Sequence, residues 1–244
     1  MSRRVRLGML TPSSNTVLEP VTAAMLSGLP EVSVHFGRFP VTEIALSDPA
    51  LAQFDDGPIL AAARLLAHGR MDVIAWNGTS SGWLGFEADE RMCRRITEAT
   101  GIPATTSMLA LNEILQRTAV QRLGLVTPYT DDVQARIVAN YAALGHPCAA
   151  ERHLGLRDNF SFSEVEGDTL HAVAREVAGM GASALAVVCT NLRAAPLVAA
   201  MEAEFGVPVY DTIATAVWKS LGLAGVDARR VIDWGRLFQD LPAA

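Results

Sequence analysis

Residues 6–17 read Arg-Leu-Gly-Met-Leu-Thr-Pro-Ser-Ser-Asn-Thr-Val, and residues 122–133 read Arg-Leu-Gly-Leu-Val-Thr-Pro-Tyr-Thr-Asp-Asp-Val. In each stretch a short apolar run is followed by Thr-Pro and then by polar residues that commonly begin helices. Such a run is typical of a buried strand that leads into a helix. The repetition predicts two copies of one α/β unit, against the alternative of a chance likeness between two ordinary strand-helix units.

A second pair of segments repeats in the same order, at residues 98–107 (EATGIPATTS) and 203–212 (AEFGVPVYDT). Each segment has a glycine that can end a helix, followed after one residue by a proline that can open a strand. The two segments therefore predict equivalent helix-to-strand connections in the two copies.

A third pair joins residues 72–80 (DVIAWNGTS) to residues 184–191 (ALAVVCTN). Each is an apolar strand that ends in small polar residues. The register of this pair is open, because a gapless pairing sets Cys189 opposite Asn77, one residue before Gly78.

Apolar runs alternate with Ala- and Leu-rich stretches of helical length along the whole chain. Strands are predicted at residues 5–10, 32–36, 72–76, 122–127, 185–189 and 207–210, and helices at residues 58–68, 89–100, 107–116, 131–144, 164–180, 195–205 and 214–223. Apolar strands separated by helices are typical of a parallel sheet covered on both faces.

We therefore expect an α/β fold of two pseudosymmetric lobes, each a parallel sheet of about four strands flanked by helices, with the active site in the cleft between them. Lobe 1 is predicted to span residues 1–117 and lobe 2 residues 118–213. The C-terminal segment 214–244 is expected to pack back on lobe 1.

The composition narrows the class of partner. The chain has 244 residues, of which 50% are hydrophobic, and a net charge of −6. This charge offers no basic surface for nucleic acid. There is no apolar run of membrane-spanning length and no signal peptide pattern, so we expect a cytoplasmic protein without a membrane partner. A homo-oligomer is possible.

The three cysteines, Cys93, Cys148 and Cys189, lie far apart in the sequence. This spacing gives no zinc-binding pattern and no disulfide framework, so we expect no metal site and a reducing compartment. No nucleotide-binding glycine motif occurs either.

A run of small polar residues, Asn77-Gly-Thr-Ser-Ser-Gly82, follows the predicted strand 72–76. Gly78 lets a ligand approach the backbone, and the hydroxyls of Thr79 and Ser80 can donate hydrogen bonds. Successive N–H groups at such a turn can bind a carboxylate or an enolate oxygen. The alternative is an ordinary turn that caps a helix.

Cys189-Thr190-Asn191 forms the matching turn at the end of strand 185–189. Free cysteine is often a small buried hydrophobic residue, which is how we interpret Cys93. Cys189 differs because polar residues follow it directly, and N–H groups of a turn can stabilise a thiolate there. On the residues alone, a core role and a catalytic role for Cys189 stay equally open.

Two more strand ends place polar side chains at the same edge of the predicted sheets. Ser13 and Asn15 follow the first strand, and Tyr129 follows the strand 122–127. Helix capping explains Ser13 and Asn15 equally well. Tyr129, directly after Thr-Pro, can point its hydroxyl into a cleft. Trp76 and Trp83 are interpreted as packing residues, although Trp83 could line the pocket for an apolar group of the substrate.

At Thr11-Pro-Ser-Ser-Asn-Thr16, at Thr127-Pro-Tyr129, and at the strand-end motifs around Gly78 and Cys189, the chain resembles the aspartate/glutamate racemase superfamily. Within it, the resemblance is to maleate cis-trans isomerases and arylmalonate decarboxylases. It covers almost the whole chain and implies two pseudosymmetric four-stranded parallel lobes with the site between them.

The sequence departs from part of that pattern. Racemases and maleate isomerases of the superfamily carry one cysteine from each lobe, whereas this chain has Cys189 in lobe 2 and Gly78 at the lobe-1 position. Arylmalonate decarboxylases also have Gly-Thr-Ser there and keep only the second cysteine. Ser13-Ser-Asn15, in contrast, resembles the isomerases, so the chain has mixed features.

The resemblance favours a cofactor-independent enzyme that decarboxylates a substituted malonate through an enediolate. Cys189 would donate the proton, and Thr79, Ser80 and Tyr129 would hydrogen-bond the retained carboxylate. The further substrate-binding residues implied are Ser13, Asn15, Gly78, Thr190 and Asn191. The alternative is a maleate cis-trans isomerase or an amino-acid racemase, and a third possibility is a non-catalytic carboxylate-binding protein. Residues 41–57 and 159–162 are expected to form lids.

Overall fold

Two parallel sheets carry the fold in the computed structural model, which describes residues 3–47 and 56–242. The strand order is β2-β1-β3-β4 in the first sheet and β6-β5-β7-β8 in the second. The strands are β1 (Val5–Pro12), β2 (Val32–Phe39), β3 (Val73–Trp76), β4 (Ala104–Thr106), β5 (Leu123–Thr127), β6 (Cys148–His153), β7 (Ala184–Val187) and β8 (Val209–Asp211). The predicted α/β fold with two pseudosymmetric four-stranded lobes is confirmed.

Strand registers settle the equivalence of the two lobes at the site. Trp76 ends β3 as Val187 ends β7, and each pairs with the last residue of the next strand. The N–H of Asn77 then donates to Leu10, as the N–H of Val188 donates to Val126. Gly78 is therefore equivalent to Cys189, and the gapless pairing of Cys189 with Asn77 is wrong. The predicted strand 185–189 also ends two residues early, so Cys189 lies in the turn that follows it.

Helices cover both faces of each sheet and connect successive strands. They are α1 (Leu18–Met25), α3 (Asp56–His68), α4 (Ser81–Leu84), α5 (Glu87–Thr100), α6 (Ser107–Arg117), α7 (Asp131–Ala143), α8 (Gly167–Gly179), α9 (Val198–Phe205), α10 (Thr212–Leu223) and α11 (Arg236–Asp240), with short 3-10 helices at Ser161–Glu164, Ala195–Leu197 and Ala228–Arg230. Gly101 and Gly206 end α5 and α9 in the left-handed conformation, with φ of 70° and 73°, as the repeated Gly-x-Pro segments predicted.

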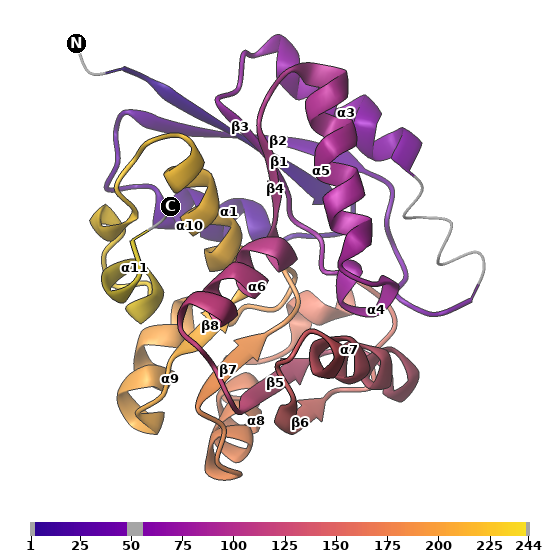
Figure 1. Cartoon of the computed structure of the whole chain (residues 1–244), viewed down its shortest axis with the longest axis vertical. Coiled ribbons are helices and arrows are strands. Elements are labelled where there is room, and N and C mark those ends of the chain that lie inside the picture. The colour runs from indigo at the N-terminus through magenta and orange to yellow at the C-terminus, as the bar shows by residue number, and fades with distance from the viewer. Residues whose placement is uncertain (1–2, 48–55, 243–244) are drawn as a thin grey trace.

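The helices α6 and α10 lie between the two sheets, and their equivalence follows from the strands that precede them (Figure 1). Each starts directly after the last strand of its sheet, and its first turn is capped by the final residue of that strand, Thr106 or Asp211. The two helices pack on each other, and the hydroxyl of Thr215 donates to the carbonyl of Ser107 at 2.9 Å. Helix α10 also contacts β3, β4 and α1.

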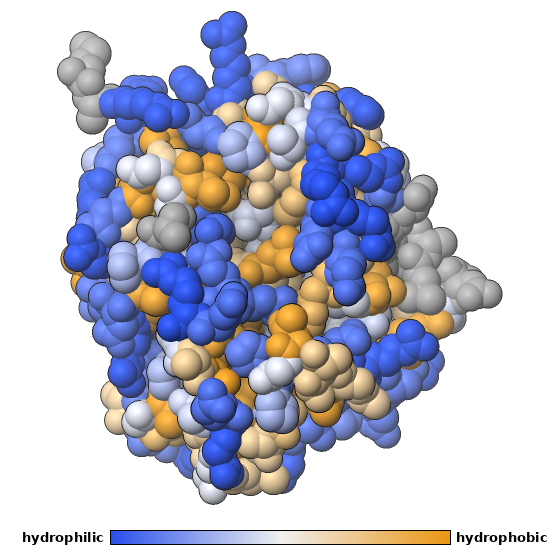
Figure 2. All heavy atoms as spheres, viewed as in Figure 1, coloured by the Kyte–Doolittle hydropathy of each residue, from blue (hydrophilic) through white to orange (hydrophobic). Residues whose placement is uncertain are grey.

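Hydrophilic side chains dominate the face shown in Figure 2, over α5 and over the C-terminal segment, and hydrophobic groups appear between them in small clusters. The large apolar side chains are instead gathered in a core that continues from one lobe to the other. Among the described residues, no helix is long and apolar enough to cross a lipid bilayer.

Candidate active site

A cavity lies between the lobes, at the carboxyl ends of strands from both sheets, where ligands of open parallel sheets bind. Its walls are formed by Pro12, Val41, Ile44, Trp76, Gly78, Thr79, Ser80, Trp83, Tyr129, Asn159, Cys189 and Thr190. The two polar turns proposed from the sequence therefore face one shared space.

Hydrogen-bond donors form the lobe-1 wall. Thr79 and Ser80 are 6% and 4% exposed and connect β3 to α4. Among the described residues, no protein acceptor pairs with the backbone N–H of Thr79 or Ser80, or with that of Thr190 across the cavity. Buried N–H groups are costly to leave unpaired. Three such donors around one cavity make a site for an anionic oxygen.

Gly78 brings no side chain to this wall, and the space beside it is already filled. A Cβ atom placed on Gly78 would overlap atoms Cζ2, Cη2 and Cε2 of Trp76. The indole is held from behind by Phe39, whose ring meets it edge-on with centroids 4.9 Å apart. A larger residue at position 78 therefore requires Trp76 to move.

A single thiol occupies the lobe-2 wall. Cys189 is 3% exposed, and its Sγ accepts the N–H of Asn191 at 3.3 Å. The pKa of the Cys189 thiol is raised to about 12, mainly by burial and to a smaller extent by the negative charge of Asp211. The hydrogen bonds from Asn191 and Tyr129 act in the opposite direction but are outweighed. Cys189 is therefore a neutral thiol at physiological pH.

Tyr129 joins the two walls. Its hydroxyl lies 2.6 Å from Oγ1 of Thr79 and also hydrogen-bonds Cys189. Burial raises the pKa of Tyr129 well above its usual value, so the phenol stays protonated. Its ring packs edge-on against Trp83 and Phe162, with centroids 5.2 and 5.7 Å apart. This packing fixes the direction of the hydroxyl.

Three residues predicted to bind substrate do not line the cavity. Asn15 donates to the carbonyl and hydroxyl of Thr190 at 3.0 and 3.2 Å, and its amide oxygen accepts the N–H groups of Val17 and Leu18 at the start of α1. The amide oxygen of Asn191 accepts the N–H of Thr16 at 3.0 Å. These bonds hold lobe 1 against lobe 2. Ser13 is exposed and bonds to Val41 instead.

The roof of the cavity comes from two loops that meet across the cleft. The N–H of Ile44 donates to Arg157, and the N–H of Asn159 donates to Thr42, both at 2.9 Å. The amide of Asn159 also reaches the hydroxyl of Ser14 at 2.7 Å. Loops were expected near residues 41–57 and 159–162. Of the first, residues 48–55 lie outside the described part of the chain.

Sequence reasoning missed part of the lining. Val41 and Ile44 were covered only by the predicted lid loop 41–57, Pro12 only by the motif Thr11–Thr16, and Trp76 was interpreted as packing only. A signal for Trp76 was present, because residues two apart on a strand point to the same face. Trp76 precedes Gly78 by that spacing. Val41 and Ile44 had no comparable signal, since their loop has no regular period.

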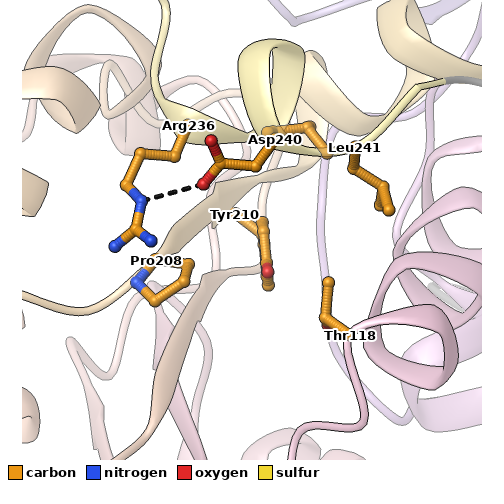
Figure 3. A pocket seen from close by; sticks show the side chains of 7 residues that line it. Thr118, Pro208, Tyr210, Arg236, Asp240 and Leu241 are labelled. Carbon is orange, nitrogen blue, oxygen red and sulfur yellow. Dashed lines mark hydrogen bonds and ion pairs between the residues drawn. The ribbon is translucent and has the colours of Figure 1, made fainter.

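A different cavity lies beside the C-terminal segment (Figure 3). It is lined by Thr118, Pro208, Tyr210, Arg236, Leu237, Asp240 and Leu241. The Nε atom of Arg236 is already paired with Asp240 at 3.1 Å. None of the predicted site residues reaches this cavity, so the reactive groups gather between the lobes.

Comparisons with known proteins identify relatives over almost the whole chain. The family model described as arylmalonate decarboxylase matches residues 12–238. The arylmalonate decarboxylase of Bordetella bronchiseptica is 27% identical, with 96% of each chain covered. The maleate isomerase of Nocardia farcinica is 26% identical, with 88% of each chain covered.

A solved structure related to the second of these is also similar. It is a cysteine-to-serine variant of the Nocardia farcinica maleate cis-trans isomerase with a covalently bound succinylcysteine intermediate. Its sequence is 26% identical, 97% of this chain and 99% of that chain are covered, and the TM-score is 0.88.

Proposed function

Because this chain belongs to the arylmalonate decarboxylase family, we propose that it decarboxylates a 2-substituted malonate without a cofactor and protonates the product with Cys189. The observation that carries the proposal is the lone thiol of the cavity. Cys189 faces Gly78, and Trp76 fills the space that a second thiol would need. One proton donor and one anion site are what this reaction requires.

The retained carboxylate would bind the lobe-1 turn. The N–H groups of Thr79, Ser80 and Thr190 are buried and without protein acceptors in the described structure. They can bind an oxygen whose negative charge grows as the enediolate forms. A preorganised donor of this kind contributes about 3 kcal/mol to the transition state. The hydroxyls of Ser80 and Tyr129 would add to this set.

The leaving carboxylate would lie toward the apolar part of the cavity, formed by Pro12, Val41 and Ile44. An apolar wall disfavours the charge that is lost as CO₂ departs. The bond between C2 and this carboxylate breaks, and its electron pair passes into the enediolate. The S–H of Cys189 then gives its proton to C2, and solvent returns a proton to the thiolate.

The protonation states favour this order of events. Burial raises the pKa of Cys189 to about 12, so the proton is present before CO₂ leaves. A nucleophilic cysteine needs the opposite shift, toward a thiolate at neutral pH. Tyr129 remains a phenol and can donate to the retained carboxylate.

Maleate isomerisation is the second candidate, because four of the similar curated proteins are maleate isomerases. In the Nocardia farcinica variant one cysteine is replaced by serine, so the succinylcysteine is on a different cysteine. In the present chain Cys93 and Cys148 do not line the cavity, and only Cys189 does. This difference favours the decarboxylase.

A substrate panel separates the candidates. Malonates with one or two substituents at C2, maleate, and single enantiomers of amino acids are incubated with the enzyme in D₂O. The proposal predicts CO₂ release from malonates and one solvent deuteron at C2 of the product. Conversion of maleate to fumarate, or exchange of the α-hydrogen without CO₂ release, would instead identify an isomerase or a racemase. Binding of malonates with no turnover of any compound would support the non-catalytic alternative.

A further inference from the structure

We infer that Trp76 determines the stereochemistry of this reaction, because its indole covers the lobe-1 side of the enediolate and leaves Cys189 as the only source of the proton. The inference depends on the proposed decarboxylation. It adds a specificity-determining residue, whose effect a malonate with two different substituents at C2 reveals.

The position of the indole is fixed by its neighbours. Trp76 is the last residue of β3 and is 2% exposed. Its six-membered ring fills the place of a Gly78 side chain, and Phe39 packs edge-on against it. Trp76 also lines the cavity together with Gly78 and Cys189. A buried ring held in this way has little freedom to swing aside.

The equivalent position in lobe 2 leaves its turn open. Val187 replaces Trp76 at the end of β7, and Cys189 replaces Gly78 two residues later. Val187 does not line the cavity, whereas Cys189 does. The same backbone position therefore presents an indole surface in lobe 1 and an S–H group in lobe 2.

The chemical consequence concerns the two faces of a planar enediolate. A proton can be added to C2 from either face, and the two additions give opposite enantiomers when the substituents differ. On the lobe-1 side the donors of Thr79 and Ser80 bind the carboxylate oxygens in the proposed mechanism, and the carbon atoms of the indole carry no acidic proton and exclude water. Protonation from the Cys189 side then gives one enantiomer in excess.

A measurement of product enantiomers tests the inference. The probe is 2-methyl-2-phenylmalonate, whose product is separated by chiral chromatography, with CO₂ release followed in the same samples. The wild-type enzyme should give one enantiomer in large excess. In Trp76→Leu the enantiomer ratio should fall by about tenfold or more, because water reaches the exposed face. The matched control is Trp218→Leu, which removes an equally buried indole outside the cavity and should keep the ratio.

The outcomes separate the inference from the proposed function. An unchanged enantiomer ratio in Trp76→Leu, with CO₂ release that still needs Cys189, would overturn the inference alone. A racemic product from the wild-type enzyme would do the same. Absence of CO₂ release from every malonate by the wild-type protein would overturn the proposed function, and this inference with it.

Thermal unfolding gives a second test that needs no activity. Gly78→Ala adds a methyl group where the indole lies, so it should lower the Tm of the wild-type chain. In the Trp76→Leu background the same substitution should lower the Tm by much less. Equal Tm changes in the two backgrounds would show that the indole does not occupy this place, and the inference would fail.

Discussion

The turns after β3 and β7 occupy equivalent positions in the two lobes but present different chemical groups to the cavity. After β3, Gly78-Thr79-Ser80 offers N–H and hydroxyl donors without an acidic side chain, and Trp76 closes the space beside the glycine. After β7, Cys189-Thr190 offers one neutral thiol. The comparison teaches that two changes between equivalent positions, Trp76 to Val187 and Gly78 to Cys189, leave the proposed proton donor on one lobe alone.

Removal of the thiol should have the largest effect. In Cys189→Ala the enediolate loses its proton donor, so kcat for CO₂ release should fall by about 10³-fold, within the range of general acid catalysis. Initial rates of CO₂ release measure the loss. Cys148→Ala is the matched control, because that thiol lies in β6 and does not line the cavity. Equal rates in the wild type and Cys189→Ala would refute the role of the thiol.

Removal of a lobe-1 hydroxyl should have the next largest effect. Ser80→Ala deletes a donor to the retained carboxylate, and kcat should fall by about 10²-fold. Ser13→Ala should change kcat far less, because the Ser13 hydroxyl is exposed and bonds to the loop at Val41. A larger loss in Ser13→Ala than in Ser80→Ala would show that the anion binds at another place.

A thiol added to lobe 1 should first affect folding. Gly78→Cys places a side chain against Trp76, and overpacking of this kind lowers the free energy of unfolding by about 1–3 kcal/mol. Urea unfolding measures the change. With Trp76→Leu in addition, the two thiols can face each other, and exchange of the product α-hydrogen in D₂O should appear. If the Gly78→Cys single variant exchanged the α-hydrogen as fast as the double variant, the indole of Trp76 would not be blocking position 78.

The smallest expected effect concerns Asp211, which caps α10 as Thr106 caps the equivalent helix α6. Burial raises the pKa of Asp211 to about 7, although two backbone N–H groups lower it. The folded state thus holds a proton that the unfolded chain releases near pH 4. This contribution to stability is complete below about pH 4 and is lost as the pH rises toward 7.

Asp211→Asn removes that titration and keeps a side chain that caps helices well. Between pH 5 and pH 8 the free energy of unfolding of the wild type should fall by about 2–3 kcal/mol more than that of Asp211→Asn. Urea unfolding at several pH values measures the difference. Burial also raises the pKa of Asp89 to about 7. Because Asp89 is present in both proteins, its titration contributes equally to both pH profiles. Parallel pH profiles would indicate that Asp211 is ionised when buried.

Much of the fold follows from local patterns in the sequence. The repeated Arg-Leu-Gly stretches predicted β1 and β5, and the Gly-x-Pro segments predicted the connections to β4 and β8. Strand ends were less accurate, since β7 stops at Val187, two residues before Cys189. The strand β6 was not predicted, because residues 148–153 have little β-branched or aromatic character.

The candidate site could be predicted in part. Gly78, Thr79, Ser80, Tyr129, Cys189 and Thr190 come together around the cavity, and all of them stand at strand ends that carry small or polar residues. Asn15 and Asn191 stand at strand ends too, but their side chains join the lobes. Composition and position on a strand do not reveal whether an amide faces a ligand or the opposite lobe.

The sequence by itself predicted that the chain is built twice from one α/β unit and that one thiol, Cys189, stands where an apolar strand gives way to polar residues, whereas the strand registers of the structure set it opposite Gly78. The predicted features depend on residues close together in the chain, where spacing sets the geometry. Only the tertiary structure decided that the indole of Trp76 fills the space beside Gly78, that Tyr129 reaches Thr79, and that the loops at Ile44 and Asn159 meet. The physical reason is that the direction of a side chain at a strand end depends on packing against residues far away in the sequence.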